Sequence, residues 1–301
     1  MVNMTALSSR LRHAPPSRCG GRIRRAAAVA RLAGACLCLA GALVPATAAA
    51  APPAARCPDA GLAAVLEGAL PQMAARFIDS GSLKIVTIGS SSTAGAGASS
   101  PRNTYPSQLQ TDLQRRFPGY DIDVVNAGAN GQEVPDMLAR LERDVLAHRP
   151  DLVIWQFGSN GLLRGRSLPE MEAAARIGIQ RLKAAGAEVI LMDLQHAPRI
   201  DRAVARDAIL DMMQRLSNST RTALFHRYKL MKAWAAKMGN GYGEMVSTDQ
   251  LHMTDASYRC MADALASSLQ GVVMSQVAAV RTSGNLAAAV RSPTTSRRTA
   301  P

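Results

Sequence analysis

The stretch that sets the fold is KIVTIGSSSTAG, which runs from Lys84 to Gly95. Its first half is short, apolar and rich in β-branched residues, as in a strand that is buried on both faces. Its second half is a turn of serines and glycines, and the periodicity predicts an amphipathic helix over 105–117. A buried strand, a glycine-rich turn and a helix in this order predict the first unit of an α/β sheet.

The same alternation of strand and helix continues toward the C-terminus. Apolar strands are predicted at residues 122–125, 152–155, 189–192 and 223–225, and helices at residues 134–147, 168–185, 203–216, 230–238 and 256–280. Apolar strands separated by amphipathic helices predict a parallel sheet with helices on both faces and right-handed crossovers. We therefore expect one three-layer α/β/α sandwich with a central parallel sheet over residues 58–280.

The net charge of +13 comes mainly from the two ends of the chain. Residues 1–48 hold seven Arg and no Asp, Glu or Lys, and the tail from Arg281 onward holds four Arg and no acidic residue. Residues 49–280 hold 24 basic and 22 acidic residues, so the folded part gives no reason to expect a nucleic-acid partner. Residues 281–301 are rich in Ser, Thr, Arg and Pro, and we expect a disordered basic tail there.

The N-terminus has the pattern of an export signal. An Arg-rich segment precedes an apolar run over residues 26–44, and small residues follow at the spacing that a signal peptidase needs. We expect residues 1–48 to be a cleaved signal peptide, residues 49–57 a short linker, and the mature protein periplasmic or secreted. The apolar run is short and Ala-rich, so no stable membrane span is expected after cleavage. An uncleaved N-terminal anchor is the alternative.

Two cysteines, Cys57 and Cys260, lie outside the expected signal. Two cysteines in an exported protein favour one disulfide. This one would close a loop of about 200 residues, for which loop entropy predicts a stabilisation of up to roughly 5 kcal/mol. The alternative is two separate buried thiols. Neither cysteine has a Cys or His neighbour at zinc-ligand spacing, so we expect no metal.

Polar residues follow the predicted strands, at the edge where open parallel sheets form their sites. Serines follow the first strand, Gly128 lies after the second and Asn160 after the third, while Asp249 and His252 lie three residues apart before the last helix. A serine hydroxyl needs a base to become a nucleophile, and a histidine oriented by an aspartate supplies one. A glycine N–H and an asparagine amide suit the oxyanion that forms. The set predicts nucleophilic acyl transfer.

Four short blocks then resemble the SGNH hydrolases, also called GDSL esterases and lipases. The blocks come in the family's order. They are Gly89-Ser90-Ser91-Ser92-Thr93-Ala94-Gly95, then Asn126, Gly128 and Gly131, then Gly158 and Asn160, and last Asp249 and His252.

The resemblance implies a flavodoxin-like α/β/α fold and a serine esterase that needs neither a metal nor an organic cofactor. It makes Ser91 the nucleophile, with His252 as base and Asp249 as its partner. It also implies an oxyanion hole formed by the N–H groups of Ser91 and Gly128 and by Asn160 Nδ2.

Three positions depart from the family's pattern. Ser90 stands where the family usually has Asp, Gly161 replaces the Asp common after the third-block Asn, and Met253 replaces the frequent Pro after the histidine. Ser90 and Ser92 remain alternative nucleophiles. His196, after the fourth strand, is either a substrate contact or a plain loop residue.

The sequence thus predicts an exported, monomeric serine esterase acting on a small-molecule or polysaccharide ester. Acetylated sugars, short acyl esters and lysophospholipids are candidate substrates. The alternative is a catalytically inactive relative that binds a glycan or a protein partner through the same cleft; the intact Ser91, Asp249 and His252 favour the enzyme. Phosphate or dinucleotide binding is disfavoured because Gly89–Gly97 has neither a Walker ending nor G-x-G-x-x-G spacing.

Overall fold

In the computed structural model, which describes residues 57–62, 64–239 and 242–290, six strands form one sheet in the order β1-β6-β5-β4-β2-β3. The strands are β1 (Leu66–Glu67), β2 (Ser82–Gly89), β3 (Asp121–Gly128), β4 (Leu152–Gln156), β5 (Glu188–Met192) and β6 (Ala223–Phe225). Strands β2 to β6 are parallel, which confirms the predicted α/β fold, and β1 pairs antiparallel with β6 at one edge. The sequence did not predict β1, because two residues are too short to show a strand pattern.

The order of the strands determines at which point of the sheet a binding site is expected. The parallel part of the sheet starts at the inner strand β2, moves outward to β3, and then crosses back to β4 on the other side of β2. This is the flavodoxin-like arrangement, in which ligands bind beyond the carboxyl ends of the strands where the winding reverses. The reversal here lies between β2 and β4, the strands that precede Ser91 and Asn160.

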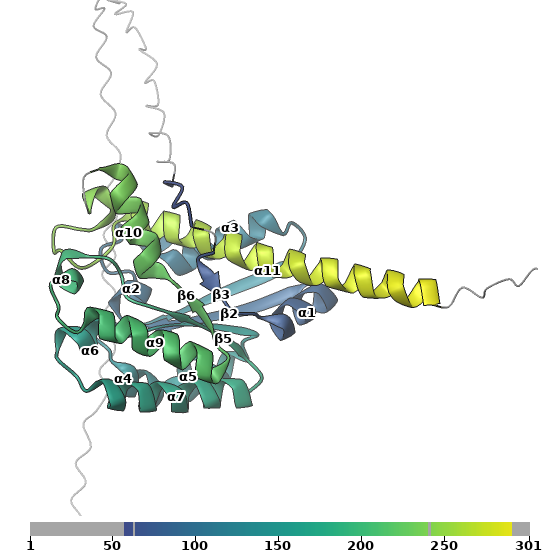
Figure 1. Cartoon of the computed structure of the whole chain (residues 1–301), viewed down its shortest axis with the longest axis horizontal. Coiled ribbons are helices and arrows are strands. Elements are labelled where there is room, and N and C mark those ends of the chain that lie inside the picture. The colour runs from purple at the N-terminus through teal and green to yellow at the C-terminus, as the bar shows by residue number, and fades with distance from the viewer. Residues whose placement is uncertain (1–56, 63, 240–241, 291–301) are drawn as a thin grey trace, which may run out of the picture. The chain divides into compact units, whose positions relative to one another are not determined.

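Helices cover both faces of the sheet (Figure 1). One face carries α1 (Pro71–Ser80), α3 (Tyr105–Arg116), α10 (Arg227–Met238) and α11 (Asp255–Val290). The other carries α4 (Val134–Ala139), α5 (Leu141–Asp144), α7 (Leu168–Ala184) and α9 (Arg206–Thr220). The short helices α2 (Ser91–Ala94), α6 (Ser159–Leu163) and α8 (Pro198–Asp201) follow the ends of β2, β4 and β5, and the 3₁₀ turns are η1 (Pro101–Asn103), η2 (Leu146–His148) and η3 (Gly243–Met245).

Successive residues of the central strands divide the core between these two faces, as the alternation of side chains along a strand requires. Ile85 and Ile154 pack with the α1, α3, α10 and α11 side, while Val86 and Val153 pack with the α4, α5, α7 and α9 side. All four side chains are fully buried. The central strands are therefore apolar throughout because both of their faces are covered.

One of the predicted helices is broken in the structure. The helix expected over 134–147 is divided into α4, α5 and η2, with Arg140 in a non-helical conformation at the break. Arg140 is 9% exposed, and its guanidinium donates to Gln132 Oε1 at 2.6 Å and to the Gly89 carbonyl at 3.4 Å. The break thus accompanies a buried arginine beneath the turn that follows β2, which hydrophobic periodicity does not reveal.

The last helix is longer than predicted. It continues to Val290, ten residues beyond the expected end at Val280, and so includes residues 281–290 of the expected tail. The run 286–290 is mainly Ala and Leu. The high helix propensity of these residues offsets the lower helix propensity of the polar residues that precede the run. The expected signal peptide, residues 49–56 of the linker and residues 291–301 of the tail lie outside the described residues. Within the described ranges, no helix has both the length and the apolar character needed to cross a membrane.

A disulfide joins the start of the described chain to α11. Cys57 and Cys260 are bonded, their Cα atoms are 5.2 Å apart, and 203 positions separate them in the sequence. Cys260 is buried in the core beside α1 and α3. The bond therefore ties the N-terminal segment to the helix that immediately follows the His252 loop.

Candidate active site

The turn between β2 and α2 presents Ser91. Strand β2 ends at Gly89 and α2 begins at Ser91, with Ser90 as its N-cap residue. A Cβ at Gly89 would come within 2.2 Å of Thr93 Oγ1 and 2.8 Å of Gln156 Oε1, so only glycine lets the turn fold this tightly. The Ser91 side chain is partly exposed, whereas Ser90 and Ser92 are buried. Of the three consecutive serines, Ser91 is the accessible one.

Ser91, His252 and Asp249 form a connected row. His252 Nε2 lies 2.8 Å from Ser91 Oγ, although the two residues are 161 positions apart in the sequence. The other ring nitrogen, Nδ1, contacts Asp249 Oδ2. The structure thus brings the three predicted residues together in the order hydroxyl, imidazole and carboxylate, which is the order that a serine nucleophile with a histidine base requires.

Asp249 is held as a carboxylate. Partial burial by itself would raise its pKa, but hydrogen bonds from the Ser247 hydroxyl, the His252 backbone and ring, and the Leu251 amide outweigh burial and hold the pKa well below its usual range. The Ser247 hydroxyl donates to Asp249 Oδ1 at 2.6 Å, and the His252 amide donates to the same oxygen at 2.9 Å. An ionised carboxylate on Nδ1 would stabilise an imidazolium, so this arrangement suits a histidine that takes up a proton.

The three expected oxyanion donors lie at the ends of three adjacent strands. Ser91 is the first residue of α2, and the first amides of a helix have no partner within it. Asn160 Nδ2 donates to the Gln132 carbonyl at 2.9 Å, and an amide nitrogen carries two hydrogens, so this bond does not exhaust it. The Gly128 amide donates to Asn126 Oδ1 at 2.9 Å. Gly128 would have to exchange that bond for one to an oxyanion.

Gln156, at the end of β4, is hydrogen-bonded to the turn between β2 and α2. This side chain is fully buried, and its Oε1 accepts from the Ser90 amide at 2.9 Å, from the Ser90 hydroxyl at 3.1 Å and from Thr93 Oγ1 at 3.2 Å. Gln156 was not predicted from the sequence. The available signal was a polar residue directly after the apolar run Leu152–Trp155.

Two glycines near the site, Gly97 and Gly161, lie where an added Cβ would collide with a neighbouring residue. A Cβ at Gly97 would come within 2.4 Å of the Met253 carbonyl and 3.2 Å of His252 Cβ, so the loop after α2 lies directly against the His252 loop. A Cβ at Gly161 would come within 2.3 Å of Met171 Cε. The methionine side chain of α7 thus occupies the space beside the third block, where the family commonly has an aspartate.

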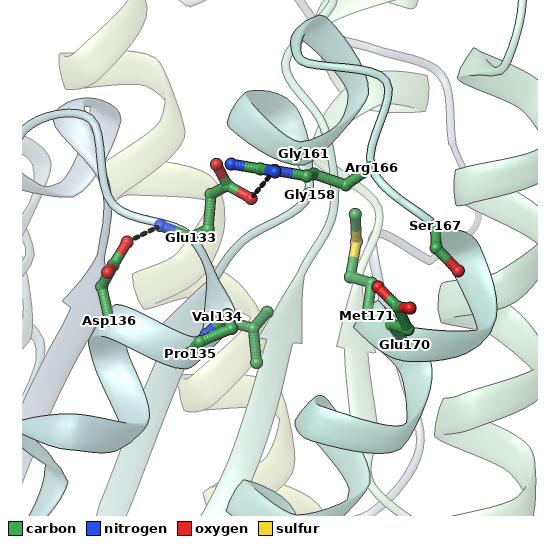
Figure 2. A pocket seen from close by; sticks show the side chains of 10 residues that line it. All are labelled: Glu133, Val134, Pro135, Asp136, Gly158, Gly161, Arg166, Ser167, Glu170 and Met171. Carbon is green, nitrogen blue, oxygen red and sulfur yellow. Dashed lines mark hydrogen bonds and ion pairs between the residues drawn. The ribbon is translucent and has the colours of Figure 1, made fainter.

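A cavity of about 280 Å³ lies between the starts of α4 and α7 (Figure 2). Its lining residues are Glu133, Val134, Pro135, Asp136, Gly158, Gly161, Arg166, Ser167, Glu170 and Met171. Ser91, His252 and Asp249 are not among them, so these three residues do not line the cavity. The two lining glycines flank Asn160 in the sequence, which makes the cavity a neighbour of the expected oxyanion hole.

An ion-pair cluster spans the mouth of this cavity. Arg166 Nε lies 2.9 Å from Glu133 Oε2, as Figure 2 shows, and Arg164 Nη1 lies 2.5 Å from Glu133 Oε1. Burial opposes ionisation of Glu133, but hydrogen bonds from the two arginines lower its pKa. The cluster joins the loop before α4 to the loop between α6 and α7.

His196 is not part of the row formed by Ser91, His252 and Asp249. Its Nδ1 is 2.8 Å from Asp201 Oδ2, and its ring packs against Tyr228 and Tyr242 with centroids 5.3 and 4.8 Å away. Burial lowers the pKa of His196, and the nearby Asp201 carboxylate only partly offsets this. These contacts favour the loop role over substrate contact. Among the described residues, no group of three His, Cys, Asp or Glu side chains is arranged to hold a metal ion.

Comparison with known proteins gives a family and several curated relatives. The model of a family described as the non-GDSL lipase-like family matches residues 54–274, more than half of the chain. Esterase TesA of Pseudomonas aeruginosa is 34% identical over 100 residues, which are 31% of this chain and 50% of TesA. An arylesterase of Vibrio mimicus is 28% identical over 141 residues, 47% of this chain and 68% of the relative. An acetylxylan esterase of Geobacillus stearothermophilus is 43% identical over 60 residues, 20% of this chain and 27% of the relative.

Solved esterase structures share the fold. The acetyl xylan esterase AlAXEase superposes with a TM-score of 0.54 at 21% identity, covering 62% of this chain and 99% of that one. TesA gives a TM-score of 0.53 at 24% identity, with 62% and 98% covered. A two-domain esterase active on acetylated mannans gives 0.58 at 19% identity, with 70% and 55% covered. At these identities the likeness concerns the fold, which confirms the predicted SGNH-type architecture.

Proposed function

The chain belongs to the non-GDSL lipase-like family, and we propose that it is an exported serine esterase that hydrolyses carboxylic esters through an acyl-enzyme on Ser91. One observation carries the proposal. A partly exposed serine hydroxyl lies 2.8 Å from His252 Nε2, and an ionised Asp249 contacts the other nitrogen of the same ring. Without a catalytic role, nothing requires residues so far apart in the sequence to meet in this order.

In the first half of the reaction, Ser91 becomes acylated. His252 Nε2 takes the hydroxyl proton as Ser91 Oγ bonds to the ester carbonyl carbon, and the carbonyl electron pair moves to its oxygen. The N–H groups of Ser91 and Gly128 and the Asn160 amide hydrogen-bond the resulting oxyanion. The imidazolium then gives its proton to the leaving alkoxide as the ester C–O bond breaks.

In the second half, water releases the acid. His252 removes a proton from a water molecule, whose oxygen attacks the acyl carbon and forms a second oxyanion in the same hole. Collapse of this intermediate breaks the bond to Ser91 Oγ, and the proton on His252 returns to the serine. The free enzyme is regenerated, and every proton movement uses the same ring nitrogen.

The substrate class we propose is acetyl groups on a polysaccharide. A relative is named an acetylxylan esterase, and solved neighbours include enzymes named for acetylated xylan and mannan. The cavity between the starts of α4 and α7 also suits a sugar, since it is small and combines carboxylate, hydroxyl and guanidinium groups with an apolar wall.

Export is part of the proposal. The Arg-rich, Ala-rich N-terminus has the order of regions found in signal peptides, and the Cys57–Cys260 bond needs an oxidising compartment to persist. Sequencing the N-terminus of protein purified from the periplasm or medium tests this, with a start near residue 49 expected. Mature protein that retains residues 1–48 would contradict cleavage.

The activity is tested with a series of p-nitrophenyl esters of increasing acyl length and with acetate release from acetylated xylan. We expect hydrolysis with a preference for acetyl. Ser91→Ala should lower kcat by at least about 10³-fold, because it removes the group that is acylated. Ser92→Ala, which alters a buried neighbour in the same turn, is the matched control and should keep most of the activity. Wild-type protein that binds glycan but hydrolyses no ester would favour the inactive-relative alternative.

A further inference from the structure

A buried glutamine contacts two loops of the candidate site. Gln195 follows β5 and is 1% exposed. Its Oε1 accepts a hydrogen bond from the Ser159 hydroxyl at 2.7 Å and another from Arg227 Nη2 at 2.9 Å. Its Nε2 donates to the Leu251 carbonyl at 3.4 Å. A single side chain is thereby bonded to residues from α6, α10 and the loop before α11.

The arginine fixes the orientation of the glutamine amide. A guanidinium can only donate hydrogen bonds, so the oxygen of Gln195 must face Arg227. The amide nitrogen then has to face the Leu251 carbonyl, because the amide group is planar and its two ends point in opposite directions. The contact with Leu251 is the longest of the three, but its direction is set by the two shorter bonds on the oxygen.

Arg227 is itself a costly residue to place here. It is fully buried, and besides Gln195 it donates from Nη2 to the Asp193 carbonyl at 2.6 Å. Burial lowers the pKa of Arg227 to about 10, which still leaves it protonated at neutral pH. Its Nε and Nη1 have no hydrogen-bond partner in the part of the chain that the structure describes. A buried guanidinium that lacks some of its hydrogen-bond partners is unfavourable for stability. A role in ordering the neighbouring residues therefore accounts for Arg227 better than a role in stability does.

The two residues that Gln195 holds directly precede two residues of the site. Ser159 is the first residue of α6 and Asn160 the second, so a bond to Ser159 sets the start of the helix that carries Asn160. Leu251 precedes His252, and its amide donates to Asp249 Oδ1 at 3.0 Å. The Leu251 residue is therefore held from one side by Asp249 and from the other by Gln195.

We propose that Gln195 is a positioning residue that fixes the separation between the His252 loop and α6, the helix that carries Asn160. Arg227 fixes the orientation of the Gln195 amide. The proposal rests on the proposed esterase function, since it concerns how the base and an oxyanion donor are kept at the right separation. Gln195 is buried and does not contact substrate, so its effect passes through Ser159 and Leu251.

This role predicts a specific kinetic signature. A misplacement of reacting groups by about 1 Å can cost on the order of 10²-fold in rate even when the altered residue is remote from the chemistry. Gln195 is buried and does not line the cavity between α4 and α7, so substrate binding should not change and KM should stay nearly constant. A purely structural role would change the melting temperature while the folded fraction kept its normal kcat.

Two variants test the two arms separately. Gln195→Glu keeps an acceptor for Ser159 and Arg227 but replaces the donor to Leu251 with a second acceptor, which opposes the Leu251 carbonyl. Ser159→Ala removes only the arm to α6. We expect each variant to lower kcat for p-nitrophenyl acetate by roughly 10- to 100-fold with KM within about twofold of wild type.

Ser217→Ala is the matched control. Ser217 is a similarly buried serine, and its hydroxyl donates to the Thr222 carbonyl at 2.6 Å near the end of α9, with no contact to the site. It should lower the melting temperature and leave kcat unchanged. Wild-type kcat in either Gln195→Glu or Ser159→Ala would overturn the proposal, because both arms are required. Failure of the esterase function is distinguishable, since the wild type would then be inactive or Ser91→Ala fully active.

Discussion

At position 90 a serine stands where the family's pattern has an aspartate, and the contact of Ser90 with Gln156 explains why a serine fits there. The Ser90 hydroxyl is 3% exposed and donates to Gln156 Oε1, the same oxygen that holds the Ser90 amide. An ionised carboxylate cannot donate a hydrogen bond, so an aspartate here would place two acceptors against each other. A serine at position 90 is therefore compatible with the buried Gln156, whereas an aspartate is not.

Ser90→Asp should therefore harm the protein although it restores the family's usual residue. We expect the free energy of unfolding to fall by about 1–3 kcal/mol, the cost of an unsatisfied buried polar group, as measured by urea denaturation. Ser90→Ala is the control, because it removes the hydroxyl without adding a charge and should cost less. A Ser90→Asp variant as stable as wild type would show that Gln156 does not select the residue at this position.

The depressed pKa of Asp249 makes a stability prediction with a definite sign. A carboxyl whose pKa is lower in the folded state stabilises the fold above its unfolded pKa, and this contribution is lost as pH falls toward the folded pKa. The advantage of wild type over Asp249→Asn should therefore be fully present at pH 7 and shrink below about pH 4, the ordinary range for Asp. Urea denaturation of both proteins at pH 7 and pH 3 checks this. An advantage that grows at pH 3 would mean that the carboxylate is not the stabilised form.

At the scale of elements, the site depends on how closely the loops after β2 and before α11 approach each other. Gly97 has φ +89° and lies against the Met253 carbonyl, one residue beyond His252. A side chain there would push the His252 loop away from Ser91. The loop contact, and not only the residues of the row, therefore determines whether the serine and the histidine meet.

Gly97→Ala should lower kcat as well as stability. The matched control is Gly119→Ala, since Gly119 has a similar φ of +86° but no atom within 4 Å of an added Cβ. Both substitutions carry the left-handed backbone cost of roughly 1–2 kcal/mol. Only Gly97→Ala should also reduce kcat on p-nitrophenyl acetate. Equal kcat in the two variants would show that the loop contact does not position His252.

At the scale of the whole molecule, the disulfide connects the N-terminal segment to α11 and closes a loop of 203 positions. Reduction should lower the melting temperature, and loop entropy sets an upper limit of roughly 5 kcal/mol on the loss. Cys57→Ser should melt at the lower temperature with and without reductant, as followed by circular dichroism. A wild-type melting temperature that is indifferent to reductant would mean that the bond adds nothing to stability.

The sequence predicted the parts of the molecule that depend on local pattern. Apolar strands and strand-end motifs were sufficient for the α/β fold, the family and the candidate residues, because each is encoded in a short stretch. Gln156, Gln195 and Arg227 were not found, because a single polar residue next to an apolar run does not show what it will contact once folded. The break at Arg140 was missed for the same reason, since the contacts of a buried arginine and not periodicity accompany it, whereas the edge strand β1 was missed because two residues are too short to show a pattern.

The central claim is that Ser91 is the nucleophile and His252 its base. Labelling with a fluorophosphonate, which modifies activated serines, followed by peptide mass spectrometry, tests it most directly. We predict one label per chain, on Ser91, and almost none in His252→Ala protein that remains folded. A label on Ser90 or Ser92, or undiminished labelling of Ser91 in the His252→Ala variant, would contradict the account.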